Sequence, residues 1–161
     1  MYESLYIHVP FCAGKCGYCA FYSLPQAGDR LKARYLDKVT QELARYTDDC
    51  RPLRSIFIGG GTPSVLGPAE LGQLLSAVNG RFRVANAEFT VECNPESLTS
   101  EKAHLLAEHG VNRVSLGVQS FQPKLRETLD RCGALDSLHE KMEALRSAGI
   151  ENIGMDLIYA I

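Results

Sequence analysis

The stretch SIFIGGGTPSVLGPAELGQLLSAVNGRF, residues 55–82, contains a complete strand, turn and helix. Its first part, 55–61, is apolar and β-branched until it reaches three glycines, which predicts a strand that ends in a turn. Pro68 stands at the first position of a predicted helix, 68–82. The apolar residues at helical spacing in this segment are Leu71, Leu74, Leu75 and Val78. The stretch therefore predicts one strand-and-helix unit.

The same alternation of short β-type runs and longer helical patterns extends over the whole chain. Further strands are expected at 4–9, 87–94, 112–120 and 152–161. Further helices are expected at 30–46, 99–110 and 134–149. Because strands that alternate with helices pair in parallel through right-handed crossovers, the pattern predicts an α/β fold with about five parallel strands. No linker or low-complexity stretch interrupts it, so we expect one domain.

Local signals mark the ends and the buried faces of these helices. The segment 99–110 begins with an N-cap candidate and ends in glycine, and 134–149 also ends in glycine. The apolar face predicted for 30–46 consists of Leu31, Tyr35, Leu36, Val39 and Leu43. Each helix is therefore expected to pack one apolar face against the sheet.

Polar and glycine-rich segments follow the predicted strands one after another. A cysteine triplet follows the first strand, GGGTP (59–63) the second, and ECNPE (92–96) the third. VQSF (118–121) ends the fourth strand, and Asp156 lies in the fifth. Because parallel strands end at the same edge of their sheet, these segments are expected to meet there, where α/β enzymes carry their sites. The clustering indicates an enzyme.

The triplet Cys12, Cys16 and Cys19 has the pattern C-x3-C-x2-C with no fourth ligand beside it. A structural zinc site takes four protein ligands, usually as two separated pairs, whereas an iron–sulfur cluster held by three cysteines leaves one iron open. The spacing favours an iron–sulfur cluster, with a zinc site or a thiol redox site as the alternatives. The other cysteines stand alone and are predicted to be packing or loop thiols: Cys50, Cys93 and Cys132.

Length and charge restrict the class of protein. The chain has 161 residues and a formal net charge of −2, with positive and negative residues interspersed. No basic patch results, so no nucleic-acid partner is expected. The chain shows neither a signal-peptide pattern nor an apolar run long enough for a transmembrane segment. We therefore expect a cytoplasmic protein whose clustered cysteines serve metal or redox chemistry, rather than one whose six cysteines form three disulfides.

The segment CAGKCGYC (12–19) resembles the cluster-binding signature of the radical S-adenosylmethionine (SAM) enzymes. Four further segments are similar to that family in the same order: FIGGGTPSVL, EFTVECNPESL, GVNRVSLGVQSF and GIENIGMDLIYAI. Together with LYIHVPFC they resemble the branch that holds oxygen-independent coproporphyrinogen III oxidase and a related haem chaperone. The resemblance implies a parallel (βα) partial barrel of the TIM type, with a [4Fe-4S] cluster and SAM as cofactors.

The resemblance also implies a role for each matching position. Cys12, Cys16 and Cys19 would hold the cluster, and SAM would be the fourth ligand, at the open iron. Tyr18 would contact the SAM adenine, and Tyr6 would lie near the SAM carboxylate. The other implied SAM contacts are Gly60, Gly61, Thr62, Glu92, Gln119, Arg131 and Asp156, of which the last three match positions that contact a second SAM or the ribose of the first.

The chemistry and the partners follow from the same resemblance. One electron passes through the cluster to SAM and cleaves it to methionine and a 5′-deoxyadenosyl radical, which abstracts hydrogen from a substrate. The cofactors perform the hard chemistry, and the barrel orients SAM and excludes water and oxygen. The implied partners are haem or a porphyrin and an electron donor such as flavodoxin or ferredoxin, with haem as an additional cofactor.

Three positions distinguish the two members of this branch. The oxidase carries an extra cysteine where this chain has Phe21. The chaperone usually has aspartate at the position of Ala20 and LGRIH where this chain reads LDRCG (129–133). In that segment Cys132 stands beside Arg131 and is a hypothetical substitute ligand for haem iron. The missing cysteine at position 21 favours the haem chaperone, whereas Ala20 and the missing histidine depart from the chaperone pattern. The oxidase and a truncated, non-catalytic remnant are the alternatives.

Related chains continue beyond the YAI at which this chain stops, with a sixth strand and a C-terminal domain. We therefore expect residues 1–161 to form a radical SAM core domain that is incomplete at its C-terminal end and has one exposed sheet edge. A fragment, a truncated gene product and a minimal protein that pairs this edge with a partner are the alternatives.

Overall fold

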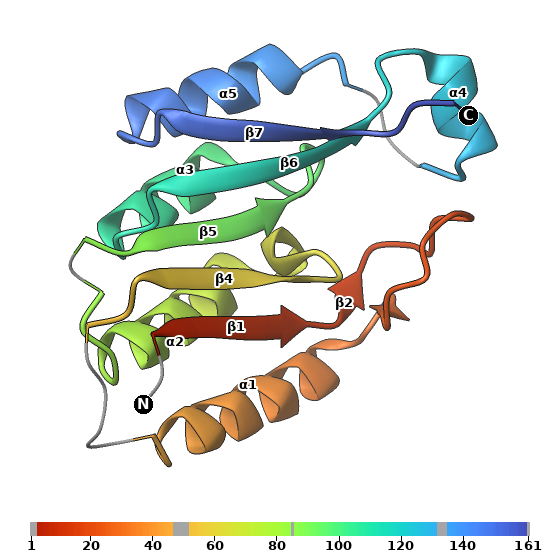
Figure 1. The fold of residues 1–161 in the computed structure, drawn as a ribbon. Helices are drawn as coiled ribbons and strands as arrows, with labels where there is room; N and C mark the ends of the chain where they lie inside the picture. Colours follow the sequence, from red (N-terminus) through yellow and green to blue (C-terminus); the bar gives the residue numbers. More distant parts are fainter. Residues whose placement is uncertain (1–2, 47–51, 85, 132–134, 161) are drawn as a thin grey trace.

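A parallel sheet of five strands forms the centre of the computed structural model, which describes residues 3–46, 52–84, 86–131 and 135–160. The strands lie in the order β1 (Ser4–Val9), β4 (Ser55–Gly60), β5 (Glu88–Cys93), β6 (Arg113–Gln119) and β7 (Asn152–Leu157). Each strand pairs in parallel with the next. The spatial order follows the chain, so each crossover adds the next strand at the same growing edge (Figure 1).

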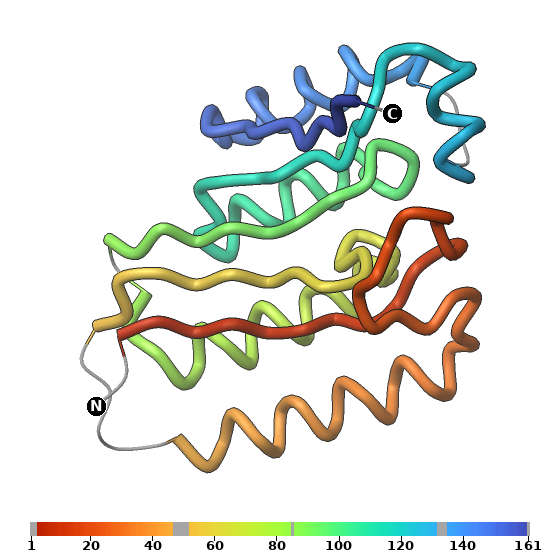
Figure 2. The backbone as a smooth tube through the Cα atoms, turned by 45° about the vertical axis from the view of Figure 1, so that its right-hand side comes forward, coloured from red at the N-terminus to blue at the C-terminus, as the bar shows by residue number. Residues whose placement is uncertain are grey.

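Helices connect successive strands and cover the outer side of the sheet. The connecting helices are α1 (Asp29–Leu43), α2 (Pro68–Asn79), α3 (Ser100–Glu108), α4 (Pro123–Thr128) and α5 (Leu138–Ser147). The pairs α1 and α2, α2 and α3, and α3 and α5 pack against each other. Figures 1 and 2 show a curved sheet with this row of helices along one side. Among the described residues, no helix has the length and apolarity that a membrane span requires.

The hydrophobic core lies between the sheet and the helices. The four apolar residues predicted on one face of α2 are at most 1 % exposed: Leu71, Leu74, Leu75 and Val78. They belong to the same buried cluster as Ile58 and Val91 from the central strands. In β1, Ile7 and Val9 are buried, whereas Tyr6, which directly precedes Ile7, is 57 % exposed. The alternation confirms that one face of the sheet packs on helices while the other face is open.

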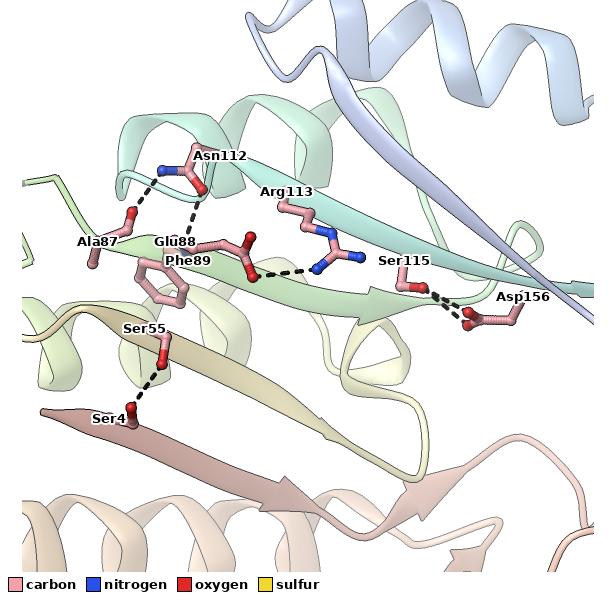
Figure 3. A network of polar contacts seen from close by, with 9 residues as sticks. All are labelled: Ser4, Ser55, Ala87, Glu88, Phe89, Asn112, Arg113, Ser115 and Asp156. Atoms are coloured by element: carbon pink, nitrogen blue, oxygen red, sulfur yellow. Dashed lines mark hydrogen bonds and ion pairs between the residues drawn. The ribbon is translucent and has the colours of Figure 1, made fainter.

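Polar side chains connect neighbouring strands near their amino-terminal ends. Ser55 Oγ donates to Ser4 Oγ over 2.8 Å, and Arg113 Nη1 lies 3.2 Å from Glu88 Oε1 (Figure 3). The side chain of Asn112 accepts the N–H of Phe89 and donates to the carbonyl of Ala87. These bonds join adjacent strands, so they support the parallel register.

The five predicted strands are confirmed, and the differences lie at the ends of elements. The helix predicted at 134–149 begins only at Leu138, with residues 132–134 outside the described part of the chain. The strand predicted at 152–161 ends at Leu157, and Ile161 also lies outside that part. Leu31 was placed on the buried face of the first helix, but it is 42 % exposed. It stands in the first turn of α1, ahead of the buried Leu36 and Leu43.

Short elements were not expected from the sequence. They are α4, the 3-10 helix η1 (Pro63–Val65), and the parallel pair β2 (Phe11–Cys12) and β3 (Leu24–Pro25). Each is too short to show a hydrophobic period, which is the signal used for the longer elements. All lie near the carboxyl ends of the main strands, where they shape the loops described next.

Candidate functional site

A cavity of about 520 Å³ opens at the carboxyl ends of the five strands. Segments at or after the end of each strand contribute to its walls, so the structure brings together the polar segments that the sequence marked. The predicted site residues in the lining are Cys12, Cys16, Tyr18, Cys19, Gly60, Gly61, Thr62, Glu92, Gln119, Arg131 and Asp156. Tyr6 is the one predicted site residue outside the lining. The individual roles of these residues stay predictions.

The cysteine loop, residues 12–22, carries all three thiols of the triplet. Phe11 immediately before it is 1 % exposed and anchors the loop in the core. Cys19 N donates to Cys16 O over 3.1 Å, which forms a tight turn between the second and third cysteines. Lys15 Nζ donates to Phe21 O over 2.8 Å and so joins the two halves of the loop. Hydrogen bonds among its own residues therefore shape this loop.

Residues from distant segments contact the loop and its sulfur atoms. Thr62 Oγ1 lies 3.8 Å from Cys12 Sγ, and Arg131 Nη1 donates to Cys16 Sγ over 3.5 Å. Arg131 thus places a positive charge beside one of the three sulfur atoms. Gly17 N donates to Leu129 O just after α4, and Figure 2 shows the loop and α4 at the same end of the sheet.

The donor set of this cavity fits an iron–sulfur cluster. Cys12, Cys16 and Cys19 are partly exposed and line one space within a single short loop. Among the residues that the structure describes, no group of three Cys, His, Asp or Glu side chains is placed to hold a single metal ion. In a cubane cluster each thiolate binds a different iron atom, so the sulfurs need not converge on one point.

The glycine turn, residues 59–64, lies directly against the start of the cysteine loop. Gly61 N donates to Val9 O and Thr62 N donates to Phe11 O, both over 2.7 Å. A Cβ on Gly61 would stand 2.6 Å from the carbonyl oxygen of Phe11, which is backbone and cannot rotate away. Gly60 has a φ of +109°, a conformation that residues with a side chain rarely adopt. Both glycines are therefore required by the local geometry.

Glu92 extends from β5 to the glycine turn. Its Oε2 accepts the N–H of Gly60 over 2.9 Å, so the carboxylate is tied to the next segment of the cavity wall. Burial raises the pKa of Glu92, and Asp156 adds to the rise, while the Gly60 hydrogen bond and His8 oppose it. A partly buried carboxylate at this position can receive a cationic group such as an amino group.

The opposite wall of the cavity comes from β6, β7 and the segment after α4. Ser115 Oγ lies 3.0 Å from both carboxylate oxygens of Asp156, and Figure 3 shows the two side chains meeting. Arg131 Nη2 donates to Gly117 O over 2.7 Å, while its buried Nε has no partner among the described residues. Gln119 has a φ of 67° and marks the shift in register between β6 and β7. This wall therefore offers a carboxylate and a guanidinium group.

The two tyrosines predicted to contact SAM differ in position. Tyr18 lines the cavity, and burial raises the pKa of its hydroxyl. Tyr6 lies on β1 outside the lining, where its Oη is 3.1 Å from His8 Nδ1. Burial, with a smaller contribution from the charge of Glu92, raises the pKa of Tyr6, so the two groups interact. Tyr6 is therefore near the site without forming its wall.

Sequence reasoning missed some residues of the lining. Ser115 and Gly117 line the cavity and alternate with Gln119 along β6. The two-residue period of a strand was the signal that could have identified them. Asn94 and Glu96 also line the cavity. They lie in the polar segment 92–96, but spacing along a loop does not indicate which of its residues face a ligand.

Of the cysteines outside the triplet, Cys93 is the one that the structure describes, and it borders the cavity from β5. Cys93 is 4 % exposed within the core, as predicted for a packing thiol. Burial raises the pKa of Cys93 to about 12, so this thiol stays protonated at neutral pH. Cys50 and Cys132, the second of which was the hypothetical haem ligand, lie outside the described residues.

Comparison with known proteins identifies relatives along almost the whole chain. The model of the radical SAM superfamily matches residues 6–161. The haem chaperone HemW of Lactococcus lactis subsp. lactis is 40 % identical over 160 residues, which cover 99 % of this chain and 41 % of that protein. The oxygen-independent coproporphyrinogen III oxidase of Bradyrhizobium diazoefficiens is 36 % identical over 162 residues, covering 98 % and 36 %. The chain thus spans less than half the length of these relatives.

Solved structures show the same fold. The coproporphyrinogen III oxidase HemN of Escherichia coli, a radical SAM enzyme, matches with a TM-score of 0.88 and 28 % identity over 97 % of this chain and 37 % of that one. The radical SAM methyltransferase TsrM of Kitasatospora setae, with a TM-score of 0.63 and 19 % identity over 97 % and 30 %, supports the fold alone. The five-stranded sheet is thus part of a TIM-type barrel. This chain belongs to the radical SAM superfamily, in the branch that contains the HemW haem chaperones and the oxygen-independent coproporphyrinogen III oxidases.

Proposed function

We propose that this chain holds a [4Fe-4S] cluster through Cys12, Cys16 and Cys19 and binds SAM at the iron that these cysteines leave open. The observation that carries the proposal is the shared cavity, because the three thiols, the glycine turn, Glu92 and Asp156 all line one space of about 520 Å³. When bound, the cluster supplies the electron that cleaves SAM to methionine and a 5′-deoxyadenosyl radical.

The cysteine loop has two tasks in this proposal. It presents three thiolates, and the positive charge of Arg131 beside Cys16 Sγ offsets part of their negative charge. It also leaves one coordination position without a protein ligand, because Ala20 and Phe21 after the third cysteine carry no ligand group. This open position is where the methionine part of SAM would bind.

The glycine turn and Glu92 orient the methionine part of SAM. The backbone of Gly60, Gly61 and Thr62 approaches the SAM amino group. A side chain at Gly60 would meet the His8 ring and one at Gly61 would meet backbone atoms of Val9 to Phe11, so the turn keeps this shape only with glycines. The Glu92 carboxylate accepts hydrogen bonds from the same end of SAM, and its bond from Gly60 holds it in place. Tyr6, which interacts with Glu92, lies on the side of the SAM carboxylate.

The remaining residues hold the nucleoside part. Tyr18 at the cavity wall packs against the adenine. Asp156, oriented by Ser115 Oγ, accepts hydrogen bonds from ribose hydroxyl groups. Gln119 and Arg131, which both line the cavity, bind the ribose or a second SAM. Together these contacts keep water away from the reacting carbon.

We infer that the chain acts in haem or porphyrin metabolism and is most like the haem chaperone. Phe21 stands where the oxidase carries its extra cysteine, and it is 67 % exposed at the cavity. Haem or a porphyrin is then the bound partner, and a flavodoxin or ferredoxin supplies the electron. Coproporphyrinogen III oxidase activity is the second candidate, favoured by the TM-score of 0.88 with the Escherichia coli oxidase. Residues 1–161 are assigned to the radical SAM core domain.

Anaerobic reconstitution of the chain with iron and sulfide tests the cofactors. We expect about four irons per chain and a broad charge-transfer absorption. After reduction, the electron paramagnetic resonance (EPR) spectrum should change when SAM is added, and 5′-deoxyadenosine should form. A variant with alanine at Cys12, Cys16 and Cys19 is the control and should bind no cluster. A wild-type chain without the absorption would contradict the proposal.

Two assays on the reconstituted chain separate the candidate functions. Haem titration should show saturable binding, and coproporphyrinogen III should not be converted when SAM and a reductant are present. Turnover of coproporphyrinogen would select the oxidase instead. Phe21→Cys supplies the cysteine of the oxidase pattern at its position and is the matched variant for the turnover assay.

A further inference from the structure

Lys102 is a buried cation in the first turn of α3. The residue is 8 % exposed, and its Nζ donates to two main-chain carbonyls, Ser64 O over 2.7 Å and Ser97 O over 2.9 Å. Ser64 is the last residue of the glycine turn, and Ser97 lies in the β5–α3 loop, residues 94–99. One ammonium group therefore joins the segments that follow two adjacent strands, β4 and β5.

Serine hydroxyl groups join the same two segments beside the ammonium. Ser64 Oγ lies 2.6 Å from Ser97 Oγ and also accepts the N–H of Asn94 over 2.9 Å. Ser64 is only 1 % exposed, so these bonds form away from solvent. In such surroundings a charged donor gives stronger hydrogen bonds than a neutral one. Lys102 therefore contributes the strongest donor of this network.

The position of Lys102 is an unfavourable one for a lysine by local criteria. Burial lowers the pKa of its ammonium group, and the N-terminal turn of a helix repels positive charge. The N-terminal end of α3 is already capped by Thr99, whose Oγ1 accepts the backbone N–H of Lys102 over 3.2 Å, so the Lys102 side chain is not needed there. Local helix preferences therefore do not explain this residue, whereas the two carbonyls that it binds do.

Both joined segments carry residues of the proposed SAM site. The glycine turn contains Gly60, and the β5–α3 loop directly follows the strand that carries Glu92. At the cavity, the hydrogen bond from Gly60 N to Glu92 Oε2 joins the glycine turn to the end of β5, directly before the β5–α3 loop. Its length depends on how the segments are placed relative to each other. Lys102 joins the two segments from the side of α3 and does not itself line the cavity.

We propose that Lys102 is a positioning residue for SAM: it holds the glycine turn and the β5–α3 loop at the spacing that lets Gly60 and Glu92 engage one SAM molecule. The inference rests on the proposed function, which identifies SAM as the ligand. The coupling of the two segments rests on the hydrogen bonds alone and is measured separately.

The test compares Lys102→Met with Lys38→Met. The first variant keeps an unbranched side chain and removes the donors, and the second makes the same change at an exposed position of α1. Both variants are reconstituted, and circular dichroism is used to check that each is folded. The SAM dissociation constant is then measured for each folded variant. We expect unchanged iron content in both and about tenfold weaker SAM binding in Lys102→Met only. The SAM-induced change in its EPR spectrum should shrink accordingly. Equal SAM affinity in the two folded variants overturns the proposal.

Hydrogen exchange measures the coupling without SAM. Amides of residues 60–64 and 94–97 should exchange faster in Lys102→Met and not in Lys38→Met. Unchanged exchange in either segment overturns the coupling. Absence of SAM binding by the wild-type chain would refute the proposed function. The exchange data would still decide whether Lys102 joins the two segments.

A second variant covers the case in which Lys102→Met does not fold. Lys102→Gln keeps an uncharged amide donor in the same position and so retains part of the network. Its SAM affinity should lie between those of the wild type and a chain without the donor, about threefold below the wild type. Wild-type affinity in folded Lys102→Gln, together with unchanged exchange of 60–64, would overturn the inference.

Discussion

The cysteine loop and the glycine turn line the same cavity but are held in place in different ways. Most residues of the cysteine loop are exposed, and a Cβ on Gly14 would meet no atom within 4 Å. Several of its bonds come from its own residues, such as those from Lys15 Nζ to Phe21 O and from Cys19 N to Cys16 O. The loop could therefore change shape without disturbing the core.

The glycine turn, in contrast, is enclosed by the fold. Its backbone bonds reach Val9 at the end of β1 and Phe11 in β2, and the turn continues into Ser64, which is 1 % exposed. A Cβ on Gly61 would stand within 3 Å of three backbone atoms. Any change of shape in this turn would therefore disturb the strands beside it.

This difference matches two distinct requirements of the proposed site. A backbone surface that recognises a small ligand group has to be rigid before the ligand arrives, because its hydrogen bonds have a fixed direction. A loop that binds a metal cluster has to be flexible enough for the cluster to enter. The metal–thiolate bonds then fix the conformation of the loop. We therefore expect the turn to depend on the fold and the cysteine loop to depend on metal.

The largest contrast is expected between two cysteines. Cys16→Ser should abolish the cluster, yet change the free energy of unfolding of the metal-free chain by less than about 0.5 kcal/mol, because the loop is exposed. Cys93→Ala should retain the cluster and lower that free energy by about 1 kcal/mol, because it removes a buried sulfur. Iron content and urea denaturation measure the two effects. Loss of the cluster in both variants would contradict the prediction that Cys16 binds the cluster and Cys93 does not.

Two glycines provide the next contrast. Gly61→Ala should lower the free energy of unfolding by about 3 kcal/mol, because its Cβ would force backbone atoms of β1 and β2 apart. Gly14→Ala meets no neighbouring atom and should be neutral or stabilising by up to about 1 kcal/mol, since alanine restricts the unfolded chain. Denaturation of both variants with urea makes the comparison. Equal destabilisation would show that the cysteine loop is as constrained as the turn.

A smaller effect is expected on SAM binding at the glycine turn. Glu92→Gln keeps an oxygen for the Gly60 N–H but removes the negative charge, so SAM should bind about tenfold more weakly. Because the pKa of Glu92 is raised, wild-type affinity should fall as the pH is lowered through that pKa, whereas Glu92→Gln should show no such fall. Calorimetric SAM titration across this range tests both statements. The same pH dependence in the variant would exclude Glu92 as its source.

The smallest expected effect concerns stability. The pKa of Glu92 is higher in the folded than in the unfolded chain, so the folded chain retains a proton between the two values. The free energy of unfolding should therefore decrease as the pH rises through this window, by less than about 1 kcal/mol because the carboxyl is partly solvated. Urea denaturation at several pH values should show this slope in the wild type and its loss in Glu92→Gln.

Elements with long regular patterns were predictable from the sequence. α2 starts at Pro68 as expected, and its apolar face is fully buried, because twelve residues show the helical period clearly. The N-cap predicted for the next helix is Thr99. α4 was missed, because six residues complete fewer than two turns and show no period. Leu31 was misplaced, because periodicity does not indicate where along a helix contact with the core begins.

The grouping of the site was predictable for a topological reason. Segments that follow parallel strands must meet at one edge, so the cysteine loop, the glycine turn and Glu92 were expected to lie together, as the structure places them. The position of Tyr6 outside the lining was not predictable. It depends on the curvature of the sheet and on the side chains of neighbouring strands, such as Phe57.

Residue order along this chain was enough to establish the succession of strands and helices and the edge at which thiols and carboxylates gather, because both depend on spacing between near neighbours. The contacts of Arg131 with Cys16, and of Lys102 with Ser64 and Ser97, emerged only in the folded molecule. Each joins loops from different strands. Such contacts depend on the relative placement of those loops, which the packing of the whole domain sets and no local pattern encodes.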